Sequence, residues 1–174
     1  MTASGLLINP FEMRPEDVRI EDIAHHLANI CRFQGATARF YSVAQHSVLV
    51  SSYLSDMDGL YGLLHDASEY LLGDVPGPLK QSEIFAAYRS AESRLQRVIY
   101  QAFGLTPDES EVLHLVDRRA LWTEQRDLMP PPLTAHLIYA DEDRNDLAPF
   151  TETIHAWSFE TSKRRFLERF AELT

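Results

Sequence analysis

Apolar residues recur three or four positions apart along most of the chain, which is the spacing of a helix face, while alternating strand patterns are scarce. The pattern predicts helices over residues 18–33, 40–54, 60–72, 82–104, 106–129 and 158–173. Residues 133–157 carry only weak periodicity and are expected to be mostly loop. The expected class is all-α, a compact single domain over residues 1–174 with about six helices.

Glycine and proline place several of the predicted helix ends. Gly73 ends the third helix, and Pro76 and Pro78 block its continuation. Thr106 and Pro107, followed by several acidic residues, form a good helix start. A short loop around residues 55–59 would make the second and third helices antiparallel neighbours.

Composition narrows the class of protein. The chain has 174 residues, of which 45% are hydrophobic and 24% charged, so it is long enough for one domain with a core. Its single cysteine, Cys31, excludes an intrachain disulfide and a thiolate zinc cluster. A net charge of −10 without any Lys/Arg run argues against a surface for duplex nucleic acid or anionic membranes. No apolar run approaches the roughly 20 residues of a membrane span, and no signal peptide is visible, so a cytoplasmic location is expected.

The third predicted helix carries the first candidate chemistry. His65, Asp66 and Glu69 lie three or four positions apart or adjacent, so all three can share one edge of an otherwise leucine-rich helix. Burying an ionised carboxylate without a partner is very costly, so the cluster indicates either a bound cation or a structural salt bridge. A hydrogen-bonded core histidine beside an incidental aspartate is the simpler alternative.

Two residues on other predicted helices favour the cation. His46 lies on the preceding helix, and Asp117 lies on the inward face of the segment that also carries Glu124. Together with His65 and Asp66 they supply two neutral nitrogens and two carboxylates, which suit Mn, Fe, Co or Zn better than Mg or Ca.

The acidic segment at residues 139–152 offers a competing ligand, Asp141. Part of this segment matches the spacing of a calcium loop, but Asp146 stands where that loop needs glycine. It is interpreted as a solvated acidic loop. Asp141 also lacks an inward-facing helical context, so Asp117 is preferred as the fourth ligand.

The order of these residues resembles the HD-domain phosphohydrolases, in particular the YfbR-type 5′-deoxynucleotidases and the bacteriophage dATP triphosphohydrolases. The matching stretches are RF at 32–33, VAQHS around His46, LLHDASEYLLGDVPGPLK at 63–80 and VDRRAL…E around Asp117. The third stretch is the most specific, since H-D-A-S-E is followed by G-D-x-P-x-P-x-K. The resemblance runs from about residue 32 to residue 128 and implies an HD-type helical bundle.

The resemblance also implies roles for individual residues. The implied metal ligands are His46, His65, Asp66 and Asp117. Asp66 and Glu69 would be the catalytic carboxylates, with Glu69 orienting or deprotonating the attacking water. The implied substrate contacts are Asp74 to the sugar 3′-hydroxyl, Arg32 and Lys80 to phosphate, and Phe33, Gly35 and Pro78 around the base.

The expected function is therefore a phosphohydrolase acting on 2′-deoxynucleotides with a divalent ion (Co, Mn, Zn or Mg) as cofactor. The short, compact layout favours a triphosphohydrolase of the dATP type. Removal of phosphate from a deoxynucleoside monophosphate is the alternative activity, and a non-catalytic nucleotide-binding module or a purely structural helical protein are the other possibilities. The expected partners are the nucleotide substrate and further copies of the chain in a homo-oligomer.

Overall fold

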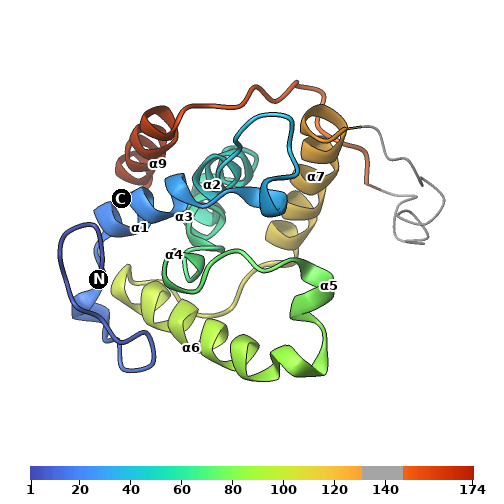
Figure 1. Ribbon diagram of the computed structural model, residues 1–174. Coiled ribbons are helices and arrows are strands. Elements are labelled where there is room, and N and C mark those ends of the chain that lie inside the picture. Colours follow the sequence, from blue (N-terminus) through green and yellow to red (C-terminus); the bar gives the residue numbers. More distant parts are fainter. Residues whose placement is uncertain (131–146) are drawn as a thin grey trace.

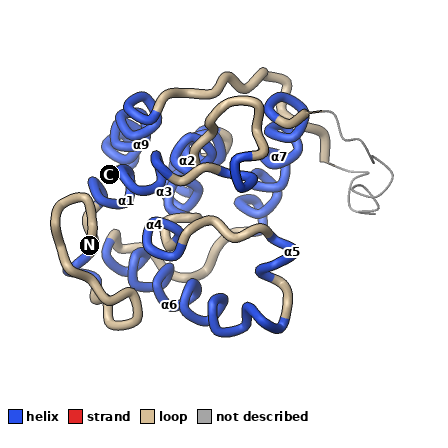
Figure 2. The backbone as a smooth tube through the Cα atoms, viewed as in Figure 1, coloured by secondary structure: helices blue, strands red, loops and turns tan. Residues whose placement is uncertain are grey.

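The protein is described by a computed structural model that covers residues 1–130 and 147–174, and these residues form helices and no strand. The longer helices are α1 (Ile20–Asn29), α2 (Val43–Ser52), α3 (Asp56–Leu64), α6 (Ala86–Ala102), α7 (Glu111–Leu128) and α9 (Phe159–Leu173). Single-turn helices α4 (Glu69–Leu72) and α5 (Gly77–Lys80) lie between α3 and α6 (Figures 1 and 2). The predicted all-α class is confirmed.

Helix α2 lies in the middle of the bundle and contacts α1, α3, α7 and α9 (Figure 1). The main core gathers buried side chains from α1, α2, α3, α6 and α9, including Leu27, Leu63, Ile99 and Phe166. Helices α2 and α3 approach closely at Gly62, where a Cβ atom would lie 3.0 Å from the Ser51 Cα. This close approach brings the two helices that carry His46 and His65 side by side.

The predicted third helix is not continuous. Helix α3 begins earlier than expected, capped by Ser55, and ends at Leu64, and α4 starts only at Glu69. Gln96 on α6 accepts a hydrogen bond from the Ser68 N–H (2.9 Å) and donates one to the Leu64 carbonyl (2.6 Å). The side chain of a remote helix thus satisfies backbone groups that a continuous helix would have paired internally, so the break is stable.

Two other predicted boundaries were wrong by several residues. Helix α1 ends at Asn29, and residues Arg32–Gly35 form a separate 3-10 turn in which Phe33 and Gln34 have positive φ angles of 54° and 52°. Helix α7 starts after Ser110, whose hydroxyl accepts a hydrogen bond from the Leu113 N–H, and not at Thr106.

The predicted loop at 133–157 is partly covered by the structure. Residues 147–157 form no helix and connect to α9, whereas residues 131–146 lie outside the described part of the chain. Within the described ranges, no helix combines the length and apolar character that a membrane span requires.

Candidate metal centre

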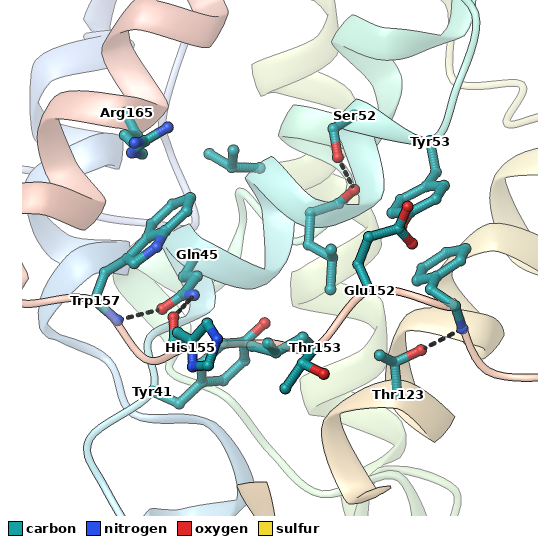
Figure 3. A pocket seen from close by; sticks show the side chains of 14 residues that line it. Tyr41, Gln45, Ser52, Tyr53, Thr123, Glu152, Thr153, His155, Trp157 and Arg165 are labelled. Atoms are coloured by element: carbon teal, nitrogen blue, oxygen red, sulfur yellow. Dashed lines mark hydrogen bonds between the residues drawn. The ribbon is translucent and has the colours of Figure 1, made fainter. Parts of the chain in front are cut away.

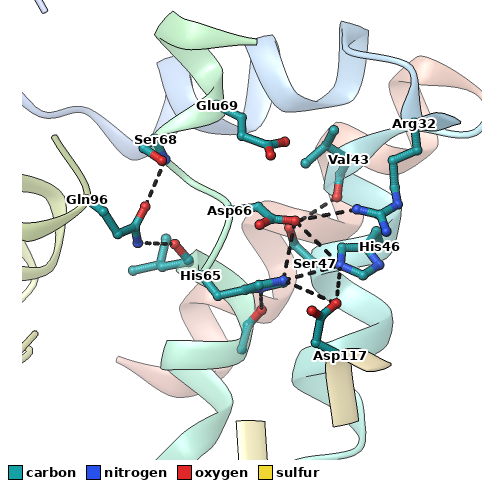
Figure 4. Close-up of polar contacts among 12 residues, drawn as sticks. Arg32, Val43, His46, Ser47, His65, Asp66, Ser68, Glu69, Gln96 and Asp117 are labelled. Carbon is teal, nitrogen blue, oxygen red and sulfur yellow. Dashed lines mark hydrogen bonds and ion pairs between the residues drawn. The ribbon is translucent and has the colours of Figure 1, made fainter. Parts of the chain in front are cut away.

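The four predicted ligands lie close together and come from α2, from the junction that follows α3 and from α7. His46 lies in α2, His65 caps the C-terminus of α3, Asp66 lies in the break after it, and Asp117 lies in α7 (Figure 4). The His46 Nε2 atom is 3.2 Å from His65 Nε2, 3.5 Å from Asp66 Oδ2 and 3.1 Å from Asp117 Oδ1. His65 Nε2 is 3.3 Å from Asp66 Oδ2 and 3.7 Å from Asp117 Oδ1.

These separations fit a small divalent cation. Ligand atoms bound at about 2.1 Å and at right angles to one another lie about 3 Å apart. The group formed by His46, His65 and Asp66 could therefore hold a metal ion with small side-chain adjustments. The Asp117 carboxylate lies close enough to both imidazoles to join them.

Hydrogen bonds at the far side of each imidazole orient the two histidines. His46 Nδ1 lies 2.7 Å from Glu124 Oε1, and His65 Nδ1 lies 2.8 Å from the carbonyl oxygen of Gly62. Both partners are acceptors, so both Nδ1 atoms carry a proton. When the two rings are neutral, the lone pair of each is on Nε2, which faces the cluster and is available to a metal ion. Metal-binding histidines in proteins show this arrangement.

Glu124 is a site residue that the sequence reasoning missed. Its side chain is fully buried, and it also accepts hydrogen bonds from the Tyr41 hydroxyl (2.9 Å) and from Arg32 Nη2 (3.0 Å). Burial raises the pKa of Glu124, but the charges of Arg32 and His46 outweigh burial, and the pKa lies below its ordinary value. Its position seven residues after Asp117, on the same helix face, was the available signal.

The carboxylates of the cluster favour positive charge at its centre. Burial lowers the pKa of His65, but Asp66 and Asp117 outweigh burial and raise it to about 10. Burial raises the pKa of Asp117, but hydrogen bonds from His46 and His65 lower it below its ordinary value. The electrostatics of the group therefore agree with a cation-binding role.

Glu69, the predicted base, lies in the first turn of α4, near Asp66 (Figure 4). Its side chain is almost fully buried, and its Oε2 atom has no hydrogen-bond partner. Its Oε1 atom lies 3.8 Å from Lys80 Nζ. Burial, together with the charges of Asp66 and Asp74, raises the pKa of Glu69 to about 10. A buried carboxyl group with a free oxygen is suited to accepting or donating a proton.

The two predicted phosphate-binding residues already have carboxylate partners. Arg32 contacts Asp66 at 3.5 Å as well as Glu124, and its guanidinium lies over the Phe33 ring at 5.4 Å. Lys80 forms a 2.7 Å ion pair with Glu92. Both cations therefore lie beside the cluster, but neither is free of negative neighbours.

The remaining predicted substrate residues lie in two segments that a hydrogen bond joins. Gln34, in the turn that also contains Phe33 and Gly35, donates from Nε2 to the backbone carbonyl of Asp74 (2.8 Å). Burial raises the pKa of Asp74. Gly35 is exposed, as is Pro78 in α5. The structure thus brings the turn at Arg32–Gly35 next to the segment that follows α4.

Other histidines and acids stay outside the cluster. His26 Nε2 accepts a hydrogen bond from the Ala3 N–H, and His114 lies 3.8 Å from Glu109. The competing ligand Asp141 lies outside the described residues.

A separate pocket of about 350 Å³ lies between α2 and the segment that leads to α9 (Figure 3). Tyr41 lines this pocket with its ring and contacts Glu124 with its hydroxyl. Gln45, next to His46, donates to the His155 carbonyl and accepts from the Trp157 N–H, both at 2.8 Å. These bonds attach the 147–157 segment to the helix that carries His46.

Comparison with known proteins identifies relatives in two bacteria. The chain is 40% identical over 127 residues to the uncharacterized protein YfdR of Escherichia coli, which covers 73% of this chain and 70% of the relative. The chain belongs to the family of YfdR. It is also 39% identical over 111 residues to the uncharacterized protein RCAP_rcc00048 of Rhodobacter capsulatus, covering 59% of this chain and 56% of that relative. No protein-family model matches the chain.

Proposed function

We propose that this member of the YfdR family is a metal-dependent phosphohydrolase acting on 2′-deoxynucleotides. The observation that carries the proposal is the convergence of His46, His65, Asp66 and Asp117 beside the buried carboxyl group of Glu69. The resemblance of the motifs to HD-domain phosphohydrolases supports the choice of reaction.

Each group has a task in displacement at phosphorus. A divalent ion bound by the cluster would polarise a phosphoryl oxygen and make water a better nucleophile. A cation held beside Asp66 would lower the raised pKa of Glu69, and the ionised carboxylate, with one oxygen that has no hydrogen-bond partner, could then accept the proton of an attacking water molecule. Arg32 can bind a phosphate oxygen through Nη1, because the contact of this atom with Asp66 is long, at 3.5 Å.

The number of phosphates on the substrate divides the proposal into two activities. The compact spacing of His46 and His65, 19 positions apart, favours a deoxynucleoside triphosphate. The ion pairs favour a monophosphate as the second candidate, because Arg32 and Lys80 are each paired with carboxylates. A triphosphate brings more negative charge than a monophosphate and needs more uncommitted cations to offset it.

A product panel tests both activities. Purified protein is incubated with Mn²⁺ or Co²⁺ and, separately, with deoxynucleoside monophosphates, deoxynucleoside triphosphates and the matching ribonucleotides. Release of inorganic triphosphate supports the first activity, and release of phosphate from monophosphates supports the second. Tight nucleotide binding without any product would instead indicate a binding module and overturn the enzyme proposal.

The expected homo-oligomer and the cytoplasmic location stay predictions. Size-exclusion chromatography with light scattering tests the first, and fractionation of expressing cells tests the second.

A further inference from the structure

One buried carboxylate joins the metal cluster to the predicted phosphate-binding arginine. Glu124 Oε1 accepts from His46 Nδ1 at 2.7 Å and from the Tyr41 hydroxyl at 2.9 Å, while Oε2 accepts from Arg32 Nη2 at 3.0 Å. The two oxygens of Glu124 therefore serve two different elements, helix α2 and the turn at Arg32–Gly35. None of the motif-based roles includes this residue.

We propose that Glu124 is a positioning residue that holds His46 in its metal-binding tautomer and at the same time holds Arg32 beside the cluster. The proposal rests on the metal site of the proposed function. It adds that metal binding and the placement of Arg32 depend on the same carboxylate, although neither the metal nor the substrate touches it.

The tautomer argument follows from donors and acceptors. An ionised carboxylate only accepts hydrogen bonds, so the 2.7 Å contact places the His46 proton on Nδ1. In the neutral ring the lone pair of His46 is then on Nε2, which points into the cluster and lies 3.1 Å from Asp117 Oδ1. Without an acceptor behind it, the imidazole could place its proton on Nε2, which cannot bind a metal in that form.

An amide at position 124 cannot serve both partners. Arg32 and the Nδ1–H of His46 are both donors, and a glutamine has one acceptor oxygen and one donor NH₂ group. If the oxygen faced Arg32, the NH₂ group would face His46 and drive its proton to Nε2. If the oxygen faced His46, the NH₂ group would face Arg32, donor against donor, in a site without water access on the Glu124 side chain.

The first test is the affinity for Mn²⁺ alone, measured by calorimetry without nucleotide. Glu124→Gln should bind Mn²⁺ about 10- to 100-fold more weakly than the wild type, which is the usual cost of removing a partner behind a metal-binding histidine. Tyr41→Phe is the matched control. It removes one donor from Glu124 but leaves the His46 and Arg32 contacts in place, so its Mn²⁺ affinity should stay within about threefold of wild type.

The second test is a rescue that a merely structural role would not produce. In Glu124→Gln/Arg32→Met the competing donor is gone, so the amide oxygen can face His46 and the double variant should bind Mn²⁺ more tightly than Glu124→Gln alone. Should Glu124→Gln not fold, Glu124→Asp replaces it, because its shorter side chain keeps the charge but cannot reach both partners.

Two outcomes would overturn the inference: wild-type Mn²⁺ affinity in the position-124 variant, or a double variant that binds no more tightly than the single one. The result is separate from the fate of the proposed function. Wild-type protein that binds Mn²⁺ but hydrolyses no nucleotide would overturn the phosphohydrolase alone.

Discussion

Two groups of histidine and aspartate lie in this bundle, and they differ in what satisfies their polar atoms. In the candidate metal centre, the Nε2 atoms of His46 and His65 lie 3.1–3.7 Å from each other and from carboxylate oxygens of Asp66 and Asp117. The second group lies on α1, where Asp22 is followed by the pair His25 and His26.

The N-terminal segment donates hydrogen bonds to Asp22 and His26 of the group on α1. Asp22, only 2% exposed, accepts from the backbone N–H and from the hydroxyl of Ser4, both at 2.7 Å. His26 Nε2 accepts from the Ala3 N–H at 3.1 Å. These contacts attach the first residues of the chain to α1. Asp22 and His26 thus accept hydrogen bonds from the chain itself, whereas the Nε2 atoms of His46 and His65 lie against each other and against the carboxylates of Asp66 and Asp117.

Replacing one aspartate of each group gives the largest expected contrast. Asp66→Ala removes a carboxylate from the centre and should lower phosphohydrolase activity at least about 100-fold, because the charge stabilisation of the reaction is lost. Asp22→Ala should lower the melting temperature and leave the specific activity of the folded protein near wild type. Steady-state rates at a temperature well below both midpoints check this, and full activity in Asp66→Ala would show that the site is misplaced.

Mn²⁺ should stabilise the folded protein through the candidate metal centre and not through the group on α1. Saturating Mn²⁺, at about 100 times its dissociation constant, adds about 2.7 kcal/mol to the free energy of unfolding. For a chain of this length the melting temperature should rise by about 5–10 °C over the chelator-treated protein. His46→Ala should abolish the rise and His26→Ala should keep it. Scanning calorimetry with and without chelator measures the effect, and an equal loss in both variants would contradict the comparison.

The third prediction concerns pH and Glu69 in the metal-free protein. Its folded pKa of about 10 lies above the ordinary value of 4.5, so the folded state holds this proton more tightly than the unfolded state. The contribution of Glu69 to stability is therefore complete below about pH 4.5 and is lost as pH rises toward 10.

Glu69→Gln, which mimics the protonated form, should remove this loss. Its stability relative to wild type should grow between pH 6 and 9 with a slope approaching about 1.4 kcal/mol per pH unit, while nucleotide hydrolysis falls. Urea unfolding at a series of pH values provides the measurement. Parallel curves for the two proteins would contradict the raised pKa.

The smallest effect is expected at the N-terminal segment. Ser4→Ala removes the hydroxyl donor to Asp22 but keeps the backbone donor, so it should cost about 1 kcal/mol and lower the melting temperature by about 2–4 °C. The Mn²⁺-induced rise should be the same as in wild type. A change in that rise would mean that the two groups are coupled through α1 and α2.

The sequence determined much of the bundle and which residues lie together at the candidate metal centre. Periodic apolar residues predicted each of the longer helices, because the buried face of a helix requires apolar residues three or four positions apart in the sequence. His46, His65, Asp66 and Asp117 could be selected because each stands on the inward face of such a helix or at its end. The position of a residue on a helix face or at a helix end is a local property of the sequence. The structure brings the four residues together.

Only the tertiary structure decided the break between α3 and α4, the contacts of Glu124 and the pairing of Arg32. The break depends on Gln96, about thirty residues away on α6, whose amide satisfies the Ser68 N–H and the Leu64 carbonyl. The pairing of Arg32 with Glu124 joins residues 92 positions apart. Periodicity predicts which face of a helix is buried, but it does not predict which donor of another element will hydrogen-bond to a buried acceptor. Hydrogen bonds of this kind hold the imidazole of His46 in the candidate metal centre.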